Sequence, residues 1–348
     1  MTETDGERSV FTLTFDAGRA GPLAALDTRL LQDSPVAVNA RVVLVLTFGA
    51  LPAVLMDGIV TTVALTPGDR PGQATLTATG EDLSLLLDRE ERDVEHVGLD
   101  DPVQVLAVLA PYAARGLVPL VVPPPSADPP LPIERVPTQH DTDLGHLTML
   151  AERHGYVAYV IPGPVPATST FYWGPPVRVG VPQRAVSVDL GPETNVTAPP
   201  QFRIDALAPV TVEGMVQDPL TGRAVPVRSG PSLRPPLAAR PLSVEYAAEL
   251  RRRRLRQSGT GIVGAFARAQ GQAERSGDAV VADGELDGAR YGGVLRPRGL
   301  VGLRGAGWSH DGLWYVREVE HELSTGGYRQ RFSLAREGHG STVPVVPV

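Results

Sequence analysis

Two alternating runs near the end of the chain constrain the fold most, because their own side chains indicate the pairing register. A short break, Ser324-Thr325-Gly326-Gly327, separates these apolar and polar runs and predicts a β-hairpin. With Thr325 and Gly326 as the loop, one face of the hairpin is apolar and the other carries opposite charges. The residues placed opposite one another are Leu323 and Tyr328, Glu322 and Arg329, Glu320 and Arg331, and Val319 and Phe332.

A loop at Gly326-Gly327 instead brings His321 opposite Phe332 and leaves Arg329 without a glutamate partner, so we prefer the first register. Glycines at 305, 307 and 312 suit a preceding turn that needs positive φ or close backbone approach. The segment Gly299 to Glu337 therefore predicts three antiparallel strands that close a sheet or barrel, with no reaction centre in it.

Composition sets broad limits on the class of protein. A chain of 348 residues can hold about two domains. It has no cysteine, which excludes disulfides and thiol catalysis and is compatible with assembly in a reducing cytoplasm. All 32 basic residues are arginine, and the net charge of −7 argues against a general preference for nucleic acid or anionic membranes.

Neither the start of the chain nor its longest apolar run predicts a membrane segment. The N-terminal MTETDGERS is acidic and polar, unlike a secretory signal. The apolar run over residues 42–60 contains Gly49, Pro52 and Asp57, so it predicts two strands and a turn rather than a membrane helix.

Periodicity predicts a mainly β chain with an α+β insertion: two antiparallel β-barrels, an inserted α/β unit and a helical insertion. The expected divisions are 1–90 for the first barrel, 91–176 for the α/β unit, 177–232 and 278–338 for the two parts of the second barrel, 233–277 for a proline-rich and helical insertion, and 339–348 for an unpacked tail.

Helices are expected at four places. Residues 81–92 have leucines at helical spacing, and residues 100–115 start with an acidic cap and a proline. A third helix begins at Asp141 or Thr142 and ends at Gly155. A fourth is capped by Ser243 and runs through Leu255.

The expected strands divide between the units, and proline-rich segments connect them. The first barrel takes strands at 11–15, 42–48, 54–65 and 74–80, the α/β unit those at 156–161 and 170–173, and the second barrel those at 184–190, 201–207 and 210–216. Eight prolines between Pro119 and Pro137 predict an extended crossing rather than regular structure. The partners of the second barrel's strands are expected from about Asp278 to Glu337.

Three blocks, in order along the chain, resemble the phage late-control D family, the baseplate hub proteins related to the hub part of VgrG spikes. One is MDGIVTTV at 56–63, which is similar to a strand of the family's first barrel, and another is QHDTDLGHLTMLAERHGYVAY at 139–159, a helix followed by a strand. The closing block carries the most positions. These are Val301, Leu303, Gly305, Gly307, Asp311, Gly312, Tyr315, Val316, Val319, His321, Gly327, Tyr328, Phe332 and Arg336.

The resemblance implies a non-enzymatic structural hub of a contractile phage tail or injection system. In such a hub a homotrimer places six similar barrels around a channel and joins a sixfold inner tube to a threefold spike. The implied partners are the spike protein, the inner tube or tube-initiator protein, and baseplate wedge proteins. Assembly is expected in the bacterial cytoplasm, with the finished protein in the baseplate. No spike repeats follow the closing hairpin in this sequence, which implies a separate spike polypeptide.

Several residue groups could carry chemistry, and each has a simpler structural interpretation. His140, Asp141, Asp143, His146 and His154 include metal-ligand types. The aspartates, however, lie where a helix start favours carboxylates, and His154 lies where a helix end favours a cation. We expect capping rather than a metal site.

The arginine run at 251–254, with Arg256, could bind phosphate, but we expect it on a solvated helix face or in subunit salt bridges. Residues 283–288 lack the spacing of a calcium loop. Trp308, Trp314 and Tyr315 could form a sugar platform, although core or interface positions are the expected alternative. Asn195-Val196-Thr197 matches a glycosylation acceptor only if the protein is secreted.

No hydrolase nucleophile motif, zinc-protease motif or phosphate-binding glycine loop occurs in the sequence. We therefore assign no catalytic, cofactor-binding or metal-binding residue, and expect no cofactor, no membrane and no nucleic-acid binding. Two alternatives remain: a tail-associated cell-wall hydrolase, whose carboxylates spacing alone cannot pair, and a stand-alone carbohydrate- or protein-binding β module.

Overall fold

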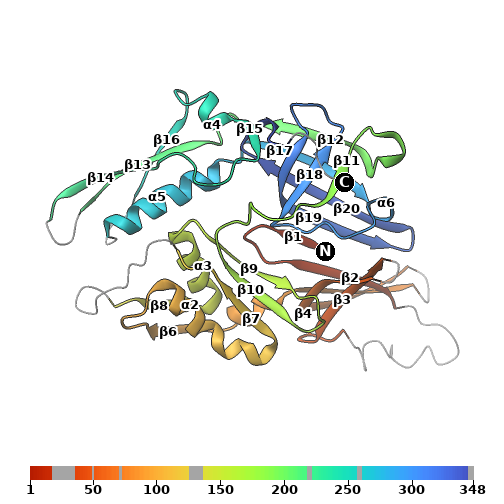
Figure 1. The fold of residues 1–348 in the computed structure, drawn as a ribbon. Helices are drawn as coiled ribbons and strands as arrows, with labels where there is room; N and C mark the ends of the chain where they lie inside the picture. Colours follow the sequence, from red (N-terminus) through yellow and green to blue (C-terminus); the bar gives the residue numbers. More distant parts are fainter. Residues whose placement is uncertain are drawn as a thin grey trace.

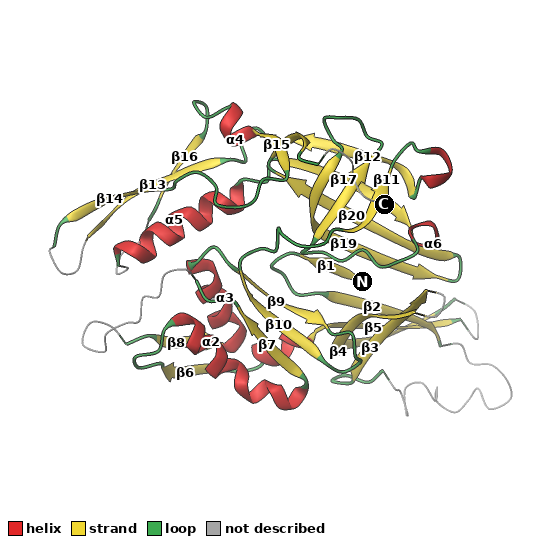
Figure 2. Ribbon diagram, viewed as in Figure 1, coloured by secondary structure: helices red, strands yellow, loops and turns green. Residues whose placement is uncertain are grey.

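A large β-sheet runs through the computed structural model and carries the smaller helical parts along one side (Figures 1 and 2). The structure describes residues 1–17, 36–48, 51–69, 73–124, 136–217, 222–256 and 261–343. The chain is mainly β with helical insertions, which confirms the predicted fold class.

The large sheet joins strands from both ends of the chain. Along its main path the order is β12-β17-β20-β19-β1-β2-β5-β4-β3, and β18 pairs with both β19 and β11. The strands are β1 (Thr2–Thr4), β2 (Val10–Asp16), β3 (Arg41–Phe48), β4 (Leu51–Pro67), β5 (Ala74–Asp82), β11 (Gln183–Ser187), β12 (Val196–Ile204), β17 (Val280–Asp287), β18 (Leu300–Arg304), β19 (Gly312–Ser324) and β20 (Gly327–Arg336).

The register of the closing hairpin is confirmed. Leu323 pairs with Tyr328 and Glu320 with Arg331 across β19 and β20, and the other two predicted pairs also form. The ion pairs centre on Arg331, which lies 3.2 Å from Glu320, 3.2 Å from Glu285 of β17 and 3.6 Å from Glu322. The charged face therefore extends over three strands.

The second β unit forms a ring that one buried amide closes. Going round the ring, β12, β17, β20, β19, β18 and β11 pair in turn. Between β11 and β12, the Asn195 side chain accepts a hydrogen bond from the Ser187 N–H at 2.8 Å and donates one to the Ala185 carbonyl at 2.9 Å. The expected pairing of strands across the insertion is present, because β12 pairs with β17. The ring is not wholly antiparallel as predicted, since β11 and β18 are parallel.

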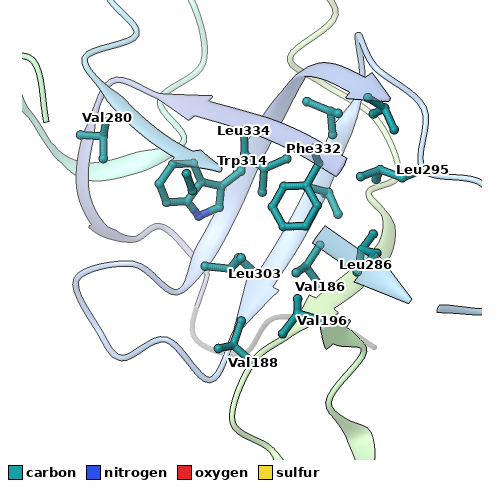
Figure 3. Packing of buried hydrophobic residues seen from close by; sticks show 14 of the residues in the cluster. Val186, Val188, Val196, Val280, Leu286, Leu295, Leu303, Trp314, Phe332 and Leu334 are labelled. Carbon is teal, nitrogen blue, oxygen red and sulfur yellow. The ribbon is translucent and has the colours of Figure 1, made fainter. Parts of the chain in front are cut away.

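Alternate residues of each strand point into this ring, and the buried ones are hydrophobic, so its inside is apolar. Trp314 and Phe332 both lie in this interior, packed with Val186, Leu303 and Leu334 (Figure 3). The Arg336 guanidinium lies 4.1 Å from the Trp314 ring centre and donates to the Asp311 carbonyl at 3.1 Å. A fully buried charge is tolerated here because backbone carbonyls and an aromatic face replace water.

The first β unit is a continuation of the same sheet through β1. The three-residue β1 pairs with β19 on one side and β2 on the other, so it is the seam between the units. Phe11 of β2 packs over Gly58 and Gly80, where an added Cβ would lie 2.9 and 2.4 Å from its ring. Among the described residues the sheet ends at β3.

The α/β unit packs helices on a three-stranded sheet. Its strands are β7 (Leu117–Val121), β10 (Ser169–Gly174) and β9 (Val157–Pro162), with β7 parallel and β9 antiparallel to β10. The helices are α2 (Asp101–Leu109) and α3 (Asp143–Arg153), and a separate pair, β6 (Glu91–Glu95) and β8 (Thr138–Thr142), completes the unit.

Two helices of this region are shorter than predicted. The segment expected as a helix over 81–92 is a 3-10 helix, η1 (Leu83–Asp88), because Asp82 belongs to β5 and residues from Glu91 onward pair with β8. The helix expected over 100–115 divides into α2 and a 3-10 helix, η2 (Ala110–Arg115), at Pro111. Pro119 lies within β7, while most of the predicted proline crossing falls outside the described residues.

The insertion differs most from expectation. Residues 243–255 were predicted as one helix, but only α4 (Leu242–Glu245) is helical, and the arginines form β16 (Arg251–Arg254). Strand β16 pairs in parallel with β13 (Val210–Gln217), and Leu255 enters the apolar core beneath α5 (Ile262–Ser276). Tertiary pairing has overridden a local helical pattern.

Two further predictions about strand membership are wrong. Residues 210–216 do not belong to the second barrel, because β13 lies in a separate sheet between β16 and β14 (Ala224–Arg228). The tail does pack in part, because β21 (Gly338–Ser341) pairs with β15 (Ala238–Pro241). The two strands approach closely at Gly338, where an added Cβ would lie 2.0 Å from the Arg240 carbonyl oxygen. Residues 344–348 of the predicted tail lie outside the described residues.

Candidate functional site

A polar cavity lies where the two β units, the α/β unit and the insertion meet. Its volume is about 1030 Å³, and its walls come from the turn after β1, from α3, from the end of α5 and from β19. The charged and hydroxyl side chains that line it include Asp5, Arg178, Arg234, Arg275, Asp278 and Tyr315.

Arg178 is the central charge of this junction. It is 5 % exposed, contacts Asp278 closely and lies 3.7 Å from Glu337. Its guanidinium also sits 5.0 Å from the centre of the Tyr315 ring. Burial by itself lowers the pKa of Arg178, but Asp278 outweighs this effect and the pKa is raised. The residue therefore stays charged and pairs the segment before β11 with the start of β17 and the end of β20.

Burial shifts the pKa of two other groups of the junction upward. It raises the pKa of the Asp5 carboxyl and places that of the Tyr315 phenol well above its usual range. For Asp5, the neighbouring Tyr315 and then nearby arginines oppose the shift without cancelling it. Both shifts favour the uncharged form of the group inside the packed junction.

Two arginines from one short segment clamp the units together. Arg296 donates to the Leu55 carbonyl of β4 at 2.8 Å, also contacts the Val54 carbonyl and lies 3.5 Å from Glu3 of β1. It thereby ties the first β unit to the second. Sequence reasoning missed this residue, because its hydrogen-bond acceptors in β4 are backbone carbonyls, which carry no sequence signature.

Arg298 makes a corresponding link to the α/β unit. It donates to the Thr4 carbonyl at 2.6 Å and the Glu7 carbonyl at 2.9 Å, and its guanidinium lies 4.1 Å from the Tyr159 ring centre. Its backbone has φ 65°, a left-handed conformation that is strained for an arginine. The contacts of the side chain maintain that conformation, so the junction is a site that fixes the relative position of three parts of the chain.

A second polar link joins the first β unit to the α/β unit. The Asp57 carboxylate, whose side chain is 0 % exposed, accepts from Arg41 at 2.7 and 2.8 Å and from the Ser169 hydroxyl at 3.0 Å. A buried carboxylate satisfied by three donors is costly to leave unpaired. Asp57 lies in the block MDGIVTTV, which the sequence placed in a strand without assigning this role.

The predicted metal-ligand types are separated by other contacts. Asp143 accepts from the Tyr112 hydroxyl at 2.7 Å and from Gln139 at 2.8 Å, while His154 lies 2.9 Å from Asp101. Thr142 is the cap of α3, since its hydroxyl accepts from the Gly145 N–H at 3.2 Å. Among the described residues, no three or more histidine, aspartate and glutamate side chains are grouped as metal ligands would be.

His146 is buried against another histidine instead. Its ring stacks on that of His96 with centres 5.2 Å apart. Burial, reinforced by His96 and Arg153, lowers the pKa of His146 to about 4. The imidazole is therefore neutral near pH 7 and serves as a packed aromatic group.

The other sequence candidates are distributed over the surface and the core. Trp314 and Tyr315 are buried, whereas Trp308 is 60 % exposed and lies beside Arg240, so the three do not form one platform. Asp287 ends β17 and caps the next helical turn by accepting from the Ala289 N–H at 2.9 Å. Asn195, noted only for a glycosylation pattern, is the residue that closes the ring.

Comparison with known proteins finds similarity in structure but not in sequence. No model of a known protein family matches the chain, and no curated protein does. Solved structures do match. The 43 kDa tail protein of prophage MuSo2 from Shewanella oneidensis superposes with a TM-score of 0.63 at 13% identity, over 97% of this chain and 93% of that one.

The chain has the fold of phage tail proteins. A tail protein from Neisseria meningitidis MC58 gives a TM-score of 0.58 at 14% identity over 82% of this chain and 81% of that one. The E. coli c3393 protein, a type VI secretion component similar to the T4 tail proteins gp27 and gp5, gives 0.55 at 12% identity over 99% and 75%. The tail-protein resemblance predicted from the three sequence blocks is thus confirmed at the level of the fold. No helix in the described part of the chain is long and apolar enough to cross a membrane.

Proposed function

We propose that this protein is a structural baseplate hub of a contractile phage tail or phage-tail-like injection system. In the proposed hub, a homotrimer forms a pseudo-sixfold ring that joins the hexameric inner tube to a trimeric spike. Its other partners would be a tube-initiator protein and baseplate wedge proteins, with assembly in the bacterial cytoplasm. The role is non-enzymatic and uses no cofactor.

The observation that carries this proposal is the tail-protein fold over nearly the whole chain, with two β units held in one sheet by β1. The MuSo2 tail protein matches over 97% of this chain. The arginine clamps at 296 and 298 support the same role, because a protein that transmits force between parts of a particle needs its own parts fixed. We also propose that the units of the chain meet at residues 90, 176, 232, 277 and 338. Residues 210–216 are the exception, because β13 lies in a separate sheet.

The test is the mass and symmetry of the purified protein. Light scattering should give three times the 36.9 kDa of the chain for the protein alone, and this mass plus that of the spike trimer after mixing with the spike protein. Averaged electron images should show a threefold ring that looks nearly sixfold. A monomer that stays monomeric when mixed with spike and tube proteins would instead favour a stand-alone β module. Peptidoglycan turnover that one carboxylate substitution abolishes would favour a hydrolase.

A further inference from the structure

Strand β16 is an open sheet edge made entirely of arginine. It lies at the end of the sheet β14-β13-β16, and all four of its residues, Arg251 to Arg254, are exposed. One side of its backbone pairs with β13, and within the described residues no strand covers the other side. The same part of the structure shows no salt bridge to these four arginines.

The arginines point alternately to the two faces of this small sheet. Leu255 packs into the core beneath α5, and Arg251 and Arg253 follow the same alternation as their register partners Val210 and Val212, which are buried on that side. Arg252 and Arg254 therefore lie on the opposite face, beside Thr211 and Glu213. A strand added to this edge would meet guanidinium groups on both faces.

Strand β6 is the chain's complementary edge. Its sequence, Glu91-Arg92-Asp93-Val94-Glu95, places three carboxylates on one face by the two-residue alternation of a strand. Four of the five residues are exposed, and the Asp93 side chain is 86% exposed. Strand β6 pairs with β8, and no third strand accompanies this pair in the part of the chain that the structure describes.

The two edges face away from each other within one molecule. Helices α5 and α3 lie between the β16 sheet and the β6-β8 pair (Figure 1). These helices approach closely: an added Cβ at Gly155, just after α3, would lie 2.4 Å from the Gly271 Cα of α5. The arginine edge and the acidic edge therefore lie on opposite outer sides of the helical half (Figure 2). They are placed to meet different neighbours.

We propose that β16 of one copy pairs with β6 of a second copy, which joins the two small sheets into one continuous sheet across the interface. An exposed edge strand is a template for pairing, and its charge decides which strand it accepts. Four arginines repel a second β16 and attract carboxylates, which favours β6 over self-pairing. Because the two surfaces differ, the contact is head-to-tail and closes into a ring when the rotation permits.

This inference rests on the homo-oligomer of the proposed function and names one of its contacts. A charge exchange tests it. We expect replacement of Arg251 to Arg254 by Glu, or of Glu91, Asp93 and Glu95 by Arg, to weaken self-association by about 100-fold or more, because like charges then face each other. The variant that carries both sets should recover association, and a mixture of the two single-set variants should form mixed complexes. Sedimentation at several concentrations measures the self-association of each single-set variant, of the variant with both sets and of the mixture.

The matched control reverses exposed arginines elsewhere. Arg290 and Arg329 have side chains 65% and 62% exposed and belong to the second β unit. Their replacement by Glu should leave association unchanged. If the β16 and β6 variants associate as the unaltered protein does, the inference fails while the proposed hub stands. If no copy associates under any condition, including with the spike protein, the proposed homotrimer fails as well.

Cysteine crosslinking tests the contact with smaller changes, since the chain has no cysteine of its own. A Val94→Cys variant is mixed in turn with four variants that each carry one Cys in place of Arg251, Arg252, Arg253 or Arg254. A disulfide should form at the β16 position opposite residue 94 and not at its immediate neighbours, because their side chains point to the other face. A Leu323→Cys variant, exposed on the closing hairpin, should not crosslink to β16.

Two other outcomes would overturn the choice of partner. Retarded migration of DNA that the β16 substitutions abolish, with self-association unaffected, would assign the arginines to phosphate binding. Crosslinks from β16 to an acidic tube or wedge protein, with none to Val94→Cys, would assign the edge to that protein.

Discussion

The two β units share one sheet but achieve their stability differently. The second unit closes on itself through Asn195 and encloses Trp314 and Phe332, which are 0 and 3 % exposed. Among the described residues, the first unit ends at β3, most of whose residues are only half buried, and Val45 is 43% exposed. One strand pattern thus gives a self-contained core in one place and an open one in the other.

The open unit is held by its neighbours. Asp57 links it to the α/β unit through Ser169, and Arg296 of the second unit binds the carbonyls of β4. A unit with an enclosed core depends on packing, whereas a unit with an open edge depends on polar links to the rest of the chain. Substitutions should therefore affect the two units by different amounts.

The largest expected effect is a Trp314→Ala substitution in the closed core. Loss of a fully buried tryptophan leaves a large void, which we expect to cost about 4–5 kcal/mol of unfolding free energy. Met56→Ala, at a buried position of the first unit, should cost about 2 kcal/mol, because the open edge lets the structure relax. Urea unfolding followed by circular dichroism compares them, and equal losses would contradict the distinction between the units.

A smaller effect is expected from Asn195→Ala at the closure of the ring. The substitution leaves the Ser187 N–H and the Ala185 carbonyl unpaired in a buried place, at a cost of about 2–3 kcal/mol. Hydrogen exchange at Ser187 should accelerate. The control is Asn39→Gly in the first unit. Glycine adopts the φ of 68° found there, and the substitution removes only an exposed hydrogen bond from Arg89. We expect the unfolding free energy to change by less than about 0.5 kcal/mol. An unchanged Ser187 exchange rate would show that the ring closes by other means.

The smallest effect concerns pH at the seam between the units. His321 of β19 is 2% exposed and sits 3.3 Å from Glu3 of β1 and 2.8 Å from the Tyr328 hydroxyl. A neutral ring protonated on Nε2 donates to Glu3 and accepts from Tyr328. Burial lowers the pKa of His321 against the opposing influence of Glu3. Burial raises the pKa of Glu3, but His321 and Arg296 outweigh it, and the pKa is lowered.

Both lowered pKa values mean that the unfolded chain binds more protons than the folded one. Stability should be complete above about pH 6.5 and fall as the pH drops below it, first through His321 and then through Glu3. In His321→Asn the fall between pH 7 and 5 should be smaller. His140→Asn, on exposed β8, is the control and should leave it unchanged. A steeper fall in His321→Asn than in the unaltered protein would reverse the assigned sign.

Local features of the fold could be predicted from the sequence. The hairpin register follows from residues within ten positions of the turn, and the cap of α3 from Thr142 and its neighbours. Residues 243–255 were mispredicted because their partner is β13, about forty residues earlier, and no local signal distinguishes an exposed arginine strand from an exposed helix face. Among the residues of the junction, Arg296 and Arg298 were missed because their acceptors are backbone carbonyls, which carry no sequence signature.

The sequence by itself determined the alternation of the strands, the turns and the charge pairs of the closing hairpin, since these depend on neighbours along the chain. Only the tertiary structure decided which strands share a sheet. It placed β1 beside β19, with Glu3 opposite Val319. Asn195 closes one β unit, while the other ends at β3 within the part of the chain that the structure describes. The physical reason is that backbone hydrogen bonds across a sheet are the same for any residue, so a partner some three hundred residues away is chosen by packing and burial rather than by local pattern.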